Sequence, residues 1–252
     1  MKALHIIFFS FLFAIAFNGC KKQNIASTYT YNVRMTDAPG PYNAVYIDLQ
    51  GAEVIGSDGK AEKLNVQSGI YNLLTLSNGK DTLIAAGELQ TATVEYIKLI
   101  LGSNNMLVVG GVSYPLNSPS SEQAGLKIRA NQTMVEGIAN IVLLDFDANK
   151  SIVQEGNGSY TLKPVIRAID LVASGVVKGT ISPAGVLATV TAISTEGLSY
   201  SSNFNSSGAY MLNGLPAGMY TVTITPASPF KAVTQSNVEV KVGYTTNIYF
   251  TL

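Results

Sequence analysis

From residue 29 onward the chain consists of short runs in which apolar and polar residues alternate, separated by Gly, Pro, Asn and Asp. In residues 44–52, for example, Val45, Ile47 and Leu49 occupy alternate positions. A period of two residues is that of a β-strand with one buried face. The Asp-Gly at 58–59 is typical of the turn between two such strands. Because no long stretch after residue 28 has the 3.6-residue period of a helix, the sequence predicts an all-β fold.

The predicted strands form two groups, because the pattern of strands and Pro/Gly turns begins again after Ser174-Gly175. Residues 138–146 are the strongest apolar run and predict a central strand. Residues 70–76 fit either a strand or a helical turn, and residues 102–105 predict a hairpin turn. We therefore expect two β-sandwich domains in series, over residues 29–173 and 176–252. The other predicted strands are 31–35, 44–52, 91–101, 106–112, 126–130 and 160–172, then 176–181, 188–194, 209–212, 219–225, 238–242 and 247–252.

The N-terminus has the composition of a secretory signal. Lys2 precedes an apolar run over residues 6–17, which is shorter than the 20 or so residues that span a membrane. The run ends at Asn18-Gly19-Cys20, and this ending resembles a bacterial lipoprotein signal. That resemblance implies a signal peptide over residues 1–19, a lipid on the Cys20 thiol and a short tether over residues 20–28. The alternative is a plain secretory peptide with a chance cysteine.

Composition narrows the chemistry of the mature chain. His5, the only histidine, leaves with the signal, and Cys20 is the only cysteine. Histidine-based triads, thiolate nucleophiles and zinc, copper or haem sites are therefore not expected. Because 16 basic residues are balanced by 16 acidic residues, the chain lacks the excess positive charge that is typical of proteins that bind nucleic acid. We expect no cofactor, while carboxylate chemistry and an oxygen-ligated calcium ion stay open.

Residues 176–252 resemble the carboxypeptidase regulatory-like domain. The resemblance rests on Gly179 in VVKGTIS, on GAYMLNGLPAGMYTVTI from Gly208 to Ile224, and on VEVKVGYTTNIYFTL. It implies a seven-stranded transthyretin-like sandwich, often grouped with carbohydrate-binding-like folds, that has no catalytic residues and acts as a spacer or accessory module. Asn205-Ser206-Ser207 stands where the family usually has Thr-Asp before the glycine.

Residues 29–172 resemble an uncharacterised bacterial lipoprotein family known as a domain of unknown function. The resemblance rests on MTDAP from Met35, VYIDLQGAEV from Val45, GLKI from Gly125, LDFDANKS from Leu144 and YTLKPVIR from Tyr160. It implies a family and leaves the function open.

One candidate metal site lies in the LDFDANKS motif, where Asp145, Asp147, Asn149 and Ser151 alternate as in the first half of a calcium loop. Lys150 stands where that loop needs glycine, and the closing acid is missing. The interpretation we favour is a strand end whose Asp side chains bond nearby amides and start a turn.

A candidate basic site for an anionic glycan comprises Lys127, Arg129 and Arg167. Alternation on short strands is also typical of a solvated face, and Arg167 could pair with Asp145 or Asp147 across strands.

A candidate aromatic platform for a sugar comprises Tyr42, Tyr46 and Tyr114, since aromatic faces pack on pyranose rings. Tyrosine also suits half-buried strands and sandwich corners, and tryptophan is absent.

Together these features predict a lipoprotein of the bacterial cell envelope, anchored through Cys20 in the outer membrane, with a non-enzymatic binding or structural role. Its partner would be a glycan or an envelope protein. The alternatives are a carbohydrate-binding accessory protein and a hydrolase that uses two carboxylates. Lys21-Lys22-Gln23-Asn24 leaves a periplasmic and a surface-facing position open.

Overall fold

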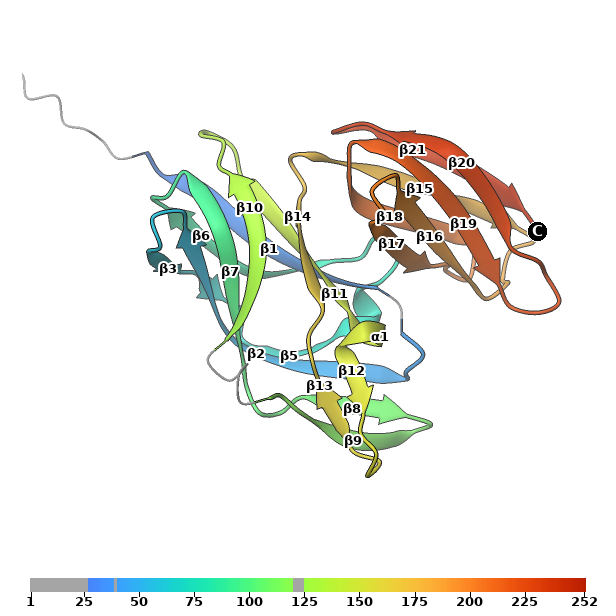
Figure 1. The fold of residues 1–252 in the computed structure, drawn as a ribbon, viewed down its shortest axis with the longest axis horizontal. Helices are drawn as coiled ribbons and strands as arrows, with labels where there is room; N and C mark the ends of the chain where they lie inside the picture. Colours follow the sequence, from blue (N-terminus) through green and yellow to red (C-terminus); the bar gives the residue numbers. More distant parts are fainter. Residues whose placement is uncertain (1–26, 39, 120–124) are drawn as a thin grey trace, which may run out of the picture.

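The computed structural model describes residues 27–38, 40–119 and 125–252, and Figure 1 shows two all-β units side by side. Cys20 and the signal peptide lie outside the described residues. The helical elements of the described part are η1, a 3-10 turn (Leu73–Leu76), and α1 (Ala148–Ser151). Within those ranges no helix is long and apolar enough to cross a membrane.

The first unit contains a five-stranded and a nine-stranded sheet around one core, so the predicted all-β class is confirmed. The five-stranded sheet has the order β14 (Ile166–Asp170), β11 (Asn140–Asp147), β1 (Tyr29–Ala38), β6 (Thr82–Leu89) and β4 (Asn65–Val66). The main path of the nine-stranded sheet is β10 (Leu126–Thr133), β7 (Thr93–Leu101), β2 (Ala44–Gly56), β8 (Met106–Val109), β9 (Val112–Asn117), β13 (Tyr160–Leu162) and β12 (Ile152–Gln154), with β3 (Ala61–Lys63) and β5 (Gly69–Asn72) also paired to β2.

Strand β11 is central, as the apolar run predicts. It pairs parallel to β1 and antiparallel to β14. Val142, Leu144 and Phe146 belong to the core of the first unit, whereas Leu143 belongs to the core of the second. Both faces of β11 are therefore buried, which explains a continuous apolar run in place of alternation.

The sequence leaves open whether residues 70–76 form a strand or a helical turn, and the structure contains both. Strand β5 pairs with β2, and the chain then continues directly into the 3-10 turn η1. The side chain of Asn72 caps η1 by accepting a hydrogen bond from the Leu74 amide.

The predicted hairpin at residues 102–105 is wrong. Strands β7 and β8 each pair antiparallel with β2, so they run in the same direction and cannot form a hairpin. Residues 102–105 instead connect β7 to β8, and both of these strands pair with β2, one after the other along its length. Buried Asp48 of β2 holds this segment, because its carboxylate accepts hydrogen bonds from the amide and the side chain of Asn104.

The second unit is the expected seven-stranded sandwich around its own core. Its first and last strands, β15 and β21, pair parallel. The three-stranded sheet has the order β18 (Ala209–Pro216), β15 (Ser174–Ser182) and β21 (Thr245–Thr251), and the four-stranded sheet has the order β17 (Ser199–Asn203), β16 (Ala188–Ser194), β19 (Gly218–Pro226) and β20 (Val233–Val240).

Gly179 of β15 lies where two strands and an aromatic ring meet. The hydroxyl of Tyr210 on β18 donates a hydrogen bond to the Ile248 carbonyl of β21, 3.1 Å away. A Cβ on residue 179 would lie 1.6 Å from that carbonyl oxygen and 3.1 Å from the Tyr210 ring. Only glycine leaves room for this contact, which gives a physical reason for the glycine of the VVKGTIS motif.

The two units share packed surface. Ile169 of β14 joins Leu143 in the core of the second unit. A turn at Asn78-Gly79 also contacts β18, because the side-chain amide of Asn78 donates to the Ala209 carbonyl and the side-chain amide of Asn213 donates to the Gly79 carbonyl. The first unit thus meets the second through apolar contacts and through backbone-directed hydrogen bonds.

Candidate functional site

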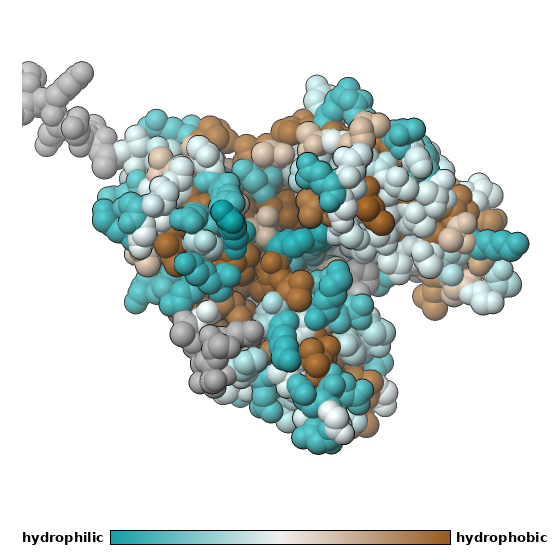
Figure 2. All heavy atoms as spheres, viewed as in Figure 1, coloured by the Kyte–Doolittle hydropathy of each residue, from teal (hydrophilic) through white to brown (hydrophobic). Residues whose placement is uncertain are grey.

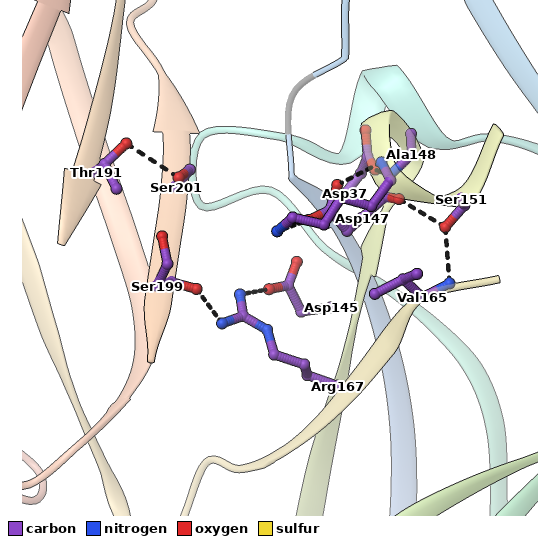
Figure 3. A network of polar contacts seen from close by, with 11 residues as sticks. Asp37, Asp145, Asp147, Ala148, Ser151, Val165, Arg167, Thr191, Ser199 and Ser201 are labelled. Carbon is purple, nitrogen blue, oxygen red and sulfur yellow. Dashed lines mark hydrogen bonds and ion pairs between the residues drawn. The ribbon is translucent and has the colours of Figure 1, made fainter. Parts of the chain in front are cut away.

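A group of charged side chains lies where β11 and β14 meet the second unit (Figure 3). The register places Arg167 of β14 beside Asp145 of β11, and the two side chains form an ion pair. The same guanidinium donates to the Ser199 carbonyl and lies 4.4 Å from the centre of the Tyr200 ring. Arg167 therefore joins a carboxylate of the first unit to a backbone oxygen and an aromatic face of the second.

Asp147 ends β11 and caps α1. Its carboxylate accepts hydrogen bonds from the Lys150 amide at 3.0 Å and from the Lys150 ammonium at 2.7 Å. Ser151 completes the turn by donating to the Asp147 carbonyl and accepting from the Val165 amide. This is the turn that we favour from sequence over a calcium loop.

Asp37, near the end of β1, is only 4% exposed. Its Oδ1 accepts a hydrogen bond from the Ala148 amide at 3.1 Å, while its Oδ2 has no partner. Burial raises the pKa of Asp37 to about 8, the Ala148 amide opposes that rise, and the charges of Asp145 and Asp147 add to it. Burial also raises the pKa of Asp145, against the influence of Arg167. Asp37 is thus a carboxyl group that the fold favours in its neutral form.

Asp37 makes the stability of the protein depend on pH. Its pKa is about 8 in the folded state and 3.8 for an ordinary exposed aspartate, so between these values the folded state keeps a proton that the unfolded state releases. We expect the free energy of unfolding to fall with rising pH by up to about 1.4 kcal/mol per pH unit from this group. In Asp37→Asn this contribution will be absent. Urea unfolding at about pH 5 and about pH 8 measures it.

The control for this experiment is Asp58→Asn, because Asp58 is exposed in a turn and its pKa is lowered by hydrogen bonds from Lys60. That variant will keep the wild-type loss of stability between the two pH values. Equal losses in wild type and Asp37→Asn would show that Asp37 does not hold the proton.

The three aspartates do not converge on one reaction centre. The register aligns Asp145 with Thr36 and Asp37 with Phe146, so the carboxylates of Asp37 and Asp145 leave the sheet on opposite faces. A cavity lined by both residues has a volume of about 30 Å³, comparable to the volume of one water and too small for a sugar ring. Asp145 is paired with Arg167, and Asp147 with Lys150.

The residues of the predicted calcium site are placed as follows: Asp145 is buried, Asp147 is half-buried and Asn149 is exposed. The carboxylates of Asp145 and Asp147 already face cations, which leaves little negative charge for a metal ion. Across the described ranges, no cluster of three or more His, Cys, Asp or Glu side chains has metal-binding geometry.

The predicted tyrosine platform is divided between two faces of the nine-stranded sheet. Tyr114 aligns with core residue Leu107, whereas Tyr46 aligns with Met106 on the opposite face. The Tyr114 ring packs edge-to-face on Tyr160 at 5.0 Å, and Tyr42 packs half-buried against the core of the first unit. These three rings therefore do not form one flat surface for a sugar.

The predicted basic site is divided as well. Lys127 and Arg129 are both exposed on β10, two residues apart and hence on one face. Arg167 lies at the contact between the units. There it forms an ion pair with Asp145, which is the alternative that the sequence left open for this residue. The signal in the sequence for the buried position of Asp37 is that it alternates in phase with Tyr31, Val33 and Met35.

The fold and these contacts define a protein of two β-sandwiches joined by apolar contacts and by hydrogen bonds. The chain belongs to the family described as Domain of unknown function (DUF4382), whose family model matches residues 28–164. Residues 172–252 match the carboxypeptidase regulatory-like domain, so the two expected domain families and their order along the chain are confirmed. No curated protein matches the chain.

Three solved structures resemble the chain at low scores. The Bacillus anthracis TIE protein is 11% identical with a TM-score of 0.27, over 88% of this chain and 40% of that one. The shaft pilin SpaA of Lactobacillus rhamnosus GG (D295N mutant) is 8% identical with a TM-score of 0.24, over 89% and 97%. The major pilin subunit BcpA of Bacillus cereus is 9% identical with a TM-score of 0.24, over 89% and 69%. The chain spans less than half of the first of these, and scores this low support no conclusion about function.

Proposed function

We propose that the protein is a lipid-anchored component of the bacterial cell envelope with a binding or structural role and no catalytic one. The non-catalytic part of the proposal is supported by the positions of three acidic side chains. Asp145 and Asp147 form ion pairs with Arg167 and Lys150, and Asp37 projects from the opposite face of the sheet to Asp145. A carboxylate hydrolase needs two acids that reach one substrate bond. No two of Asp37, Asp145 and Asp147 form such a pair.

The anchored part of the proposal rests on the N-terminal sequence, in which the basic and apolar segments end at Cys20. Thioether-linked diacylglycerol would tether the first sandwich to a membrane leaflet through residues 20–28. Because β1 begins at Tyr29, the tether is short and would keep the first unit near the membrane surface.

Replacing Cys20 tests the anchor. In cells fed a radiolabelled fatty acid, the wild-type protein will take up label and sediment with the outer membrane. Cys20→Ala will do neither, because it lacks the only thiol of the chain. Phe17→Leu is the matched control, since it changes the signal without removing the thiol and will retain the label. Label on Cys20→Ala equal to that on wild type would contradict the proposal.

The non-catalytic role is tested with the purified protein and a panel of envelope polysaccharides and peptides. We expect no cleavage. Hydrolysis by the wild type that is lost in Asp145→Asn or Asp37→Asn would overturn this part of the proposal. Protease digestion on intact cells, with lysed cells as control, then separates a surface-facing position from a periplasmic one.

A further inference from the structure

A straight row of charged side chains crosses four strands of the nine-stranded sheet on its solvent face. The register aligns Lys63 of β3 with Glu53 of β2, Glu53 with Lys98 of β7, and Lys98 with Lys127 of β10. In the next row, Arg129 of β10 aligns with Tyr96 of β7. Since aligned residues of a sheet project to the same side, Lys63, Lys98, Lys127 and Arg129 form one surface, called here the cationic face.

The cationic face has more positive charge than its own contacts neutralise. Glu53 is the one carboxylate in these rows, and it pairs with Lys98 at 3.3 Å. Lys127 lies 3.9 Å above the centre of the Tyr96 ring, and Arg129 bonds the amide oxygen of a neighbouring asparagine. Like charges placed directly opposite, such as Lys98 and Lys127, reduce the stability of a sheet. Folding alone therefore does not account for this arrangement.

A groove of about 470 Å³ adjoins the cationic face. Lys63 and Glu53 form part of its wall, and Gly51 and Ile100 also line it. Residue 51 has no side chain to fill the groove, and a Cβ there would lie 3.0 Å from the Ile100 side chain. The groove thus places Gly51 and the apolar side chain of Ile100 beside a row of cations. Hydrophilic side chains run over β7 and β10 in Figure 2.

We propose that the cationic face binds an acidic polysaccharide, whose negative groups contact Lys63, Lys127 and Arg129 while a sugar ring lies against Gly51 and Ile100. A row that spans four strands is roughly 14 Å long, which suits an extended polymer better than a single anion. The face deepens the proposed binding role by giving it a ligand class. Because binding is measured with purified protein, its failure would leave the lipid anchor untouched.

Two other polyanions fit the face less well. A membrane surface is held by cations together with exposed apolar side chains that enter the lipid. In the described part of the chain, the large exposed apolar residues lie elsewhere, for instance at Ile70 and Val112. Single-stranded nucleic acid is held by free aromatic rings, whereas the Tyr96 ring is covered by Lys127.

The test measures binding of hexagalacturonate and of dextran sulfate to the full-length protein in non-ionic detergent, with neutral maltohexaose as the reference sugar. We expect wild type to bind at least one acidic chain and to weaken as salt is added. A variant with Lys63→Gln, Lys127→Gln and Arg129→Gln will lose about tenfold or more in affinity. The matched control carries Lys163→Gln, Lys178→Gln and Lys231→Gln, which remove the same charge from exposed sites away from the face, and will bind as wild type.

For a further variant, Glu53→Gln, we expect the affinity for the acidic chains to change in the opposite direction. It removes the only carboxylate of the rows and releases Lys98, so affinity will rise by about twofold or more. The proposal is overturned if neither acidic chain binds, if the control variant loses as much affinity as the face variant, or if maltohexaose binds equally well. Binding to phosphatidylglycerol vesicles without binding to the acidic chains would identify a membrane surface instead.

Discussion

Replacing Gly179 with alanine will destabilise the second sandwich by about 3 kcal/mol or more. The new methyl group would lie 1.6 Å from the Ile248 carbonyl oxygen, which is held by the ladder between β15 and β21. Backbone cannot yield as a side chain can, so these strands must separate or the Tyr210 ring must leave its place. We expect thermal unfolding to show the loss as a lower midpoint, together with a changed near-ultraviolet tyrosine signal.

Two variants make the comparison sharp. Tyr210→Phe removes the hydroxyl that donates to Ile248 without adding any atom, and will cost about 1 kcal/mol. Gly156→Ala adds the same methyl group as Gly179→Ala at a position with no atom within 4 Å, and will change stability by less than about 0.5 kcal/mol. If Gly179→Ala costs no more than Tyr210→Phe, the close approach is not the reason for glycine.

Replacing Arg167 with methionine will cost roughly 3 kcal/mol, because it leaves the carboxylate of Asp145 buried without a cation. Asp145 is 8% exposed, and Lys150, the other cation that acts on it, is already paired with Asp147. The variant also loses the bond to the Ser199 carbonyl and the contact with the Tyr200 ring. Urea unfolding of the full-length protein measures the effect.

The double variant Asp145→Asn, Arg167→Met separates the effect of the ion pair from the effect of losing the contacts of Arg167 with Ser199 and Tyr200. With both charges removed, we expect it to be more stable than Arg167→Met alone. Arg34→Met is the matched control, because Arg34 and Arg167 are similarly exposed, while the Asp81 side chain that pairs with Arg34 is 20% exposed against 11% for that of Asp145. That variant will cost less than about 1 kcal/mol. Equal costs for Arg34→Met and Arg167→Met would mean that burial does not strengthen the second pair.

Much of the fold could be predicted because most strands have one face in a core. The alternation in residues 219–225 appears directly in β19, where every second residue is buried, whereas in residues 44–52 of β2 it is broken at Asp48, which is buried between Ile47 and Leu49. Strands β6 and β17 were missed for opposite reasons. TLIAAGEL in β6 contains small residues that blur the period, and SYSSN in β17 is polar apart from one tyrosine. Such strands are hard to predict from composition, because their stability comes from backbone pairing with neighbouring strands more than from their own side chains.

The candidate site was less predictable because it depends on register. Sequence places Lys127 and Arg129 on one face, but only the pairing of β3, β2, β7 and β10 adds Lys63 and Lys98. The same dependence separated Tyr46 from Tyr114, since a shift of one residue moves a side chain to the other face. Likewise, GSNN at residues 102–105 has the composition of a hairpin turn, and only the direction of β7 and β8 shows otherwise.

The parallel pairing of β15 with β21 sets how the second sandwich would respond to a pulling force. Chain entry at Ser174 and chain exit at Thr251 lie at opposite ends of this pair, so tension between them pulls the two strands lengthwise past each other. The hydrogen bonds of a parallel ladder are evenly spaced, and under such a load they carry the force together and do not open one by one. A module built this way resists stretching along the chain far better than an antiparallel hairpin pulled from its open end.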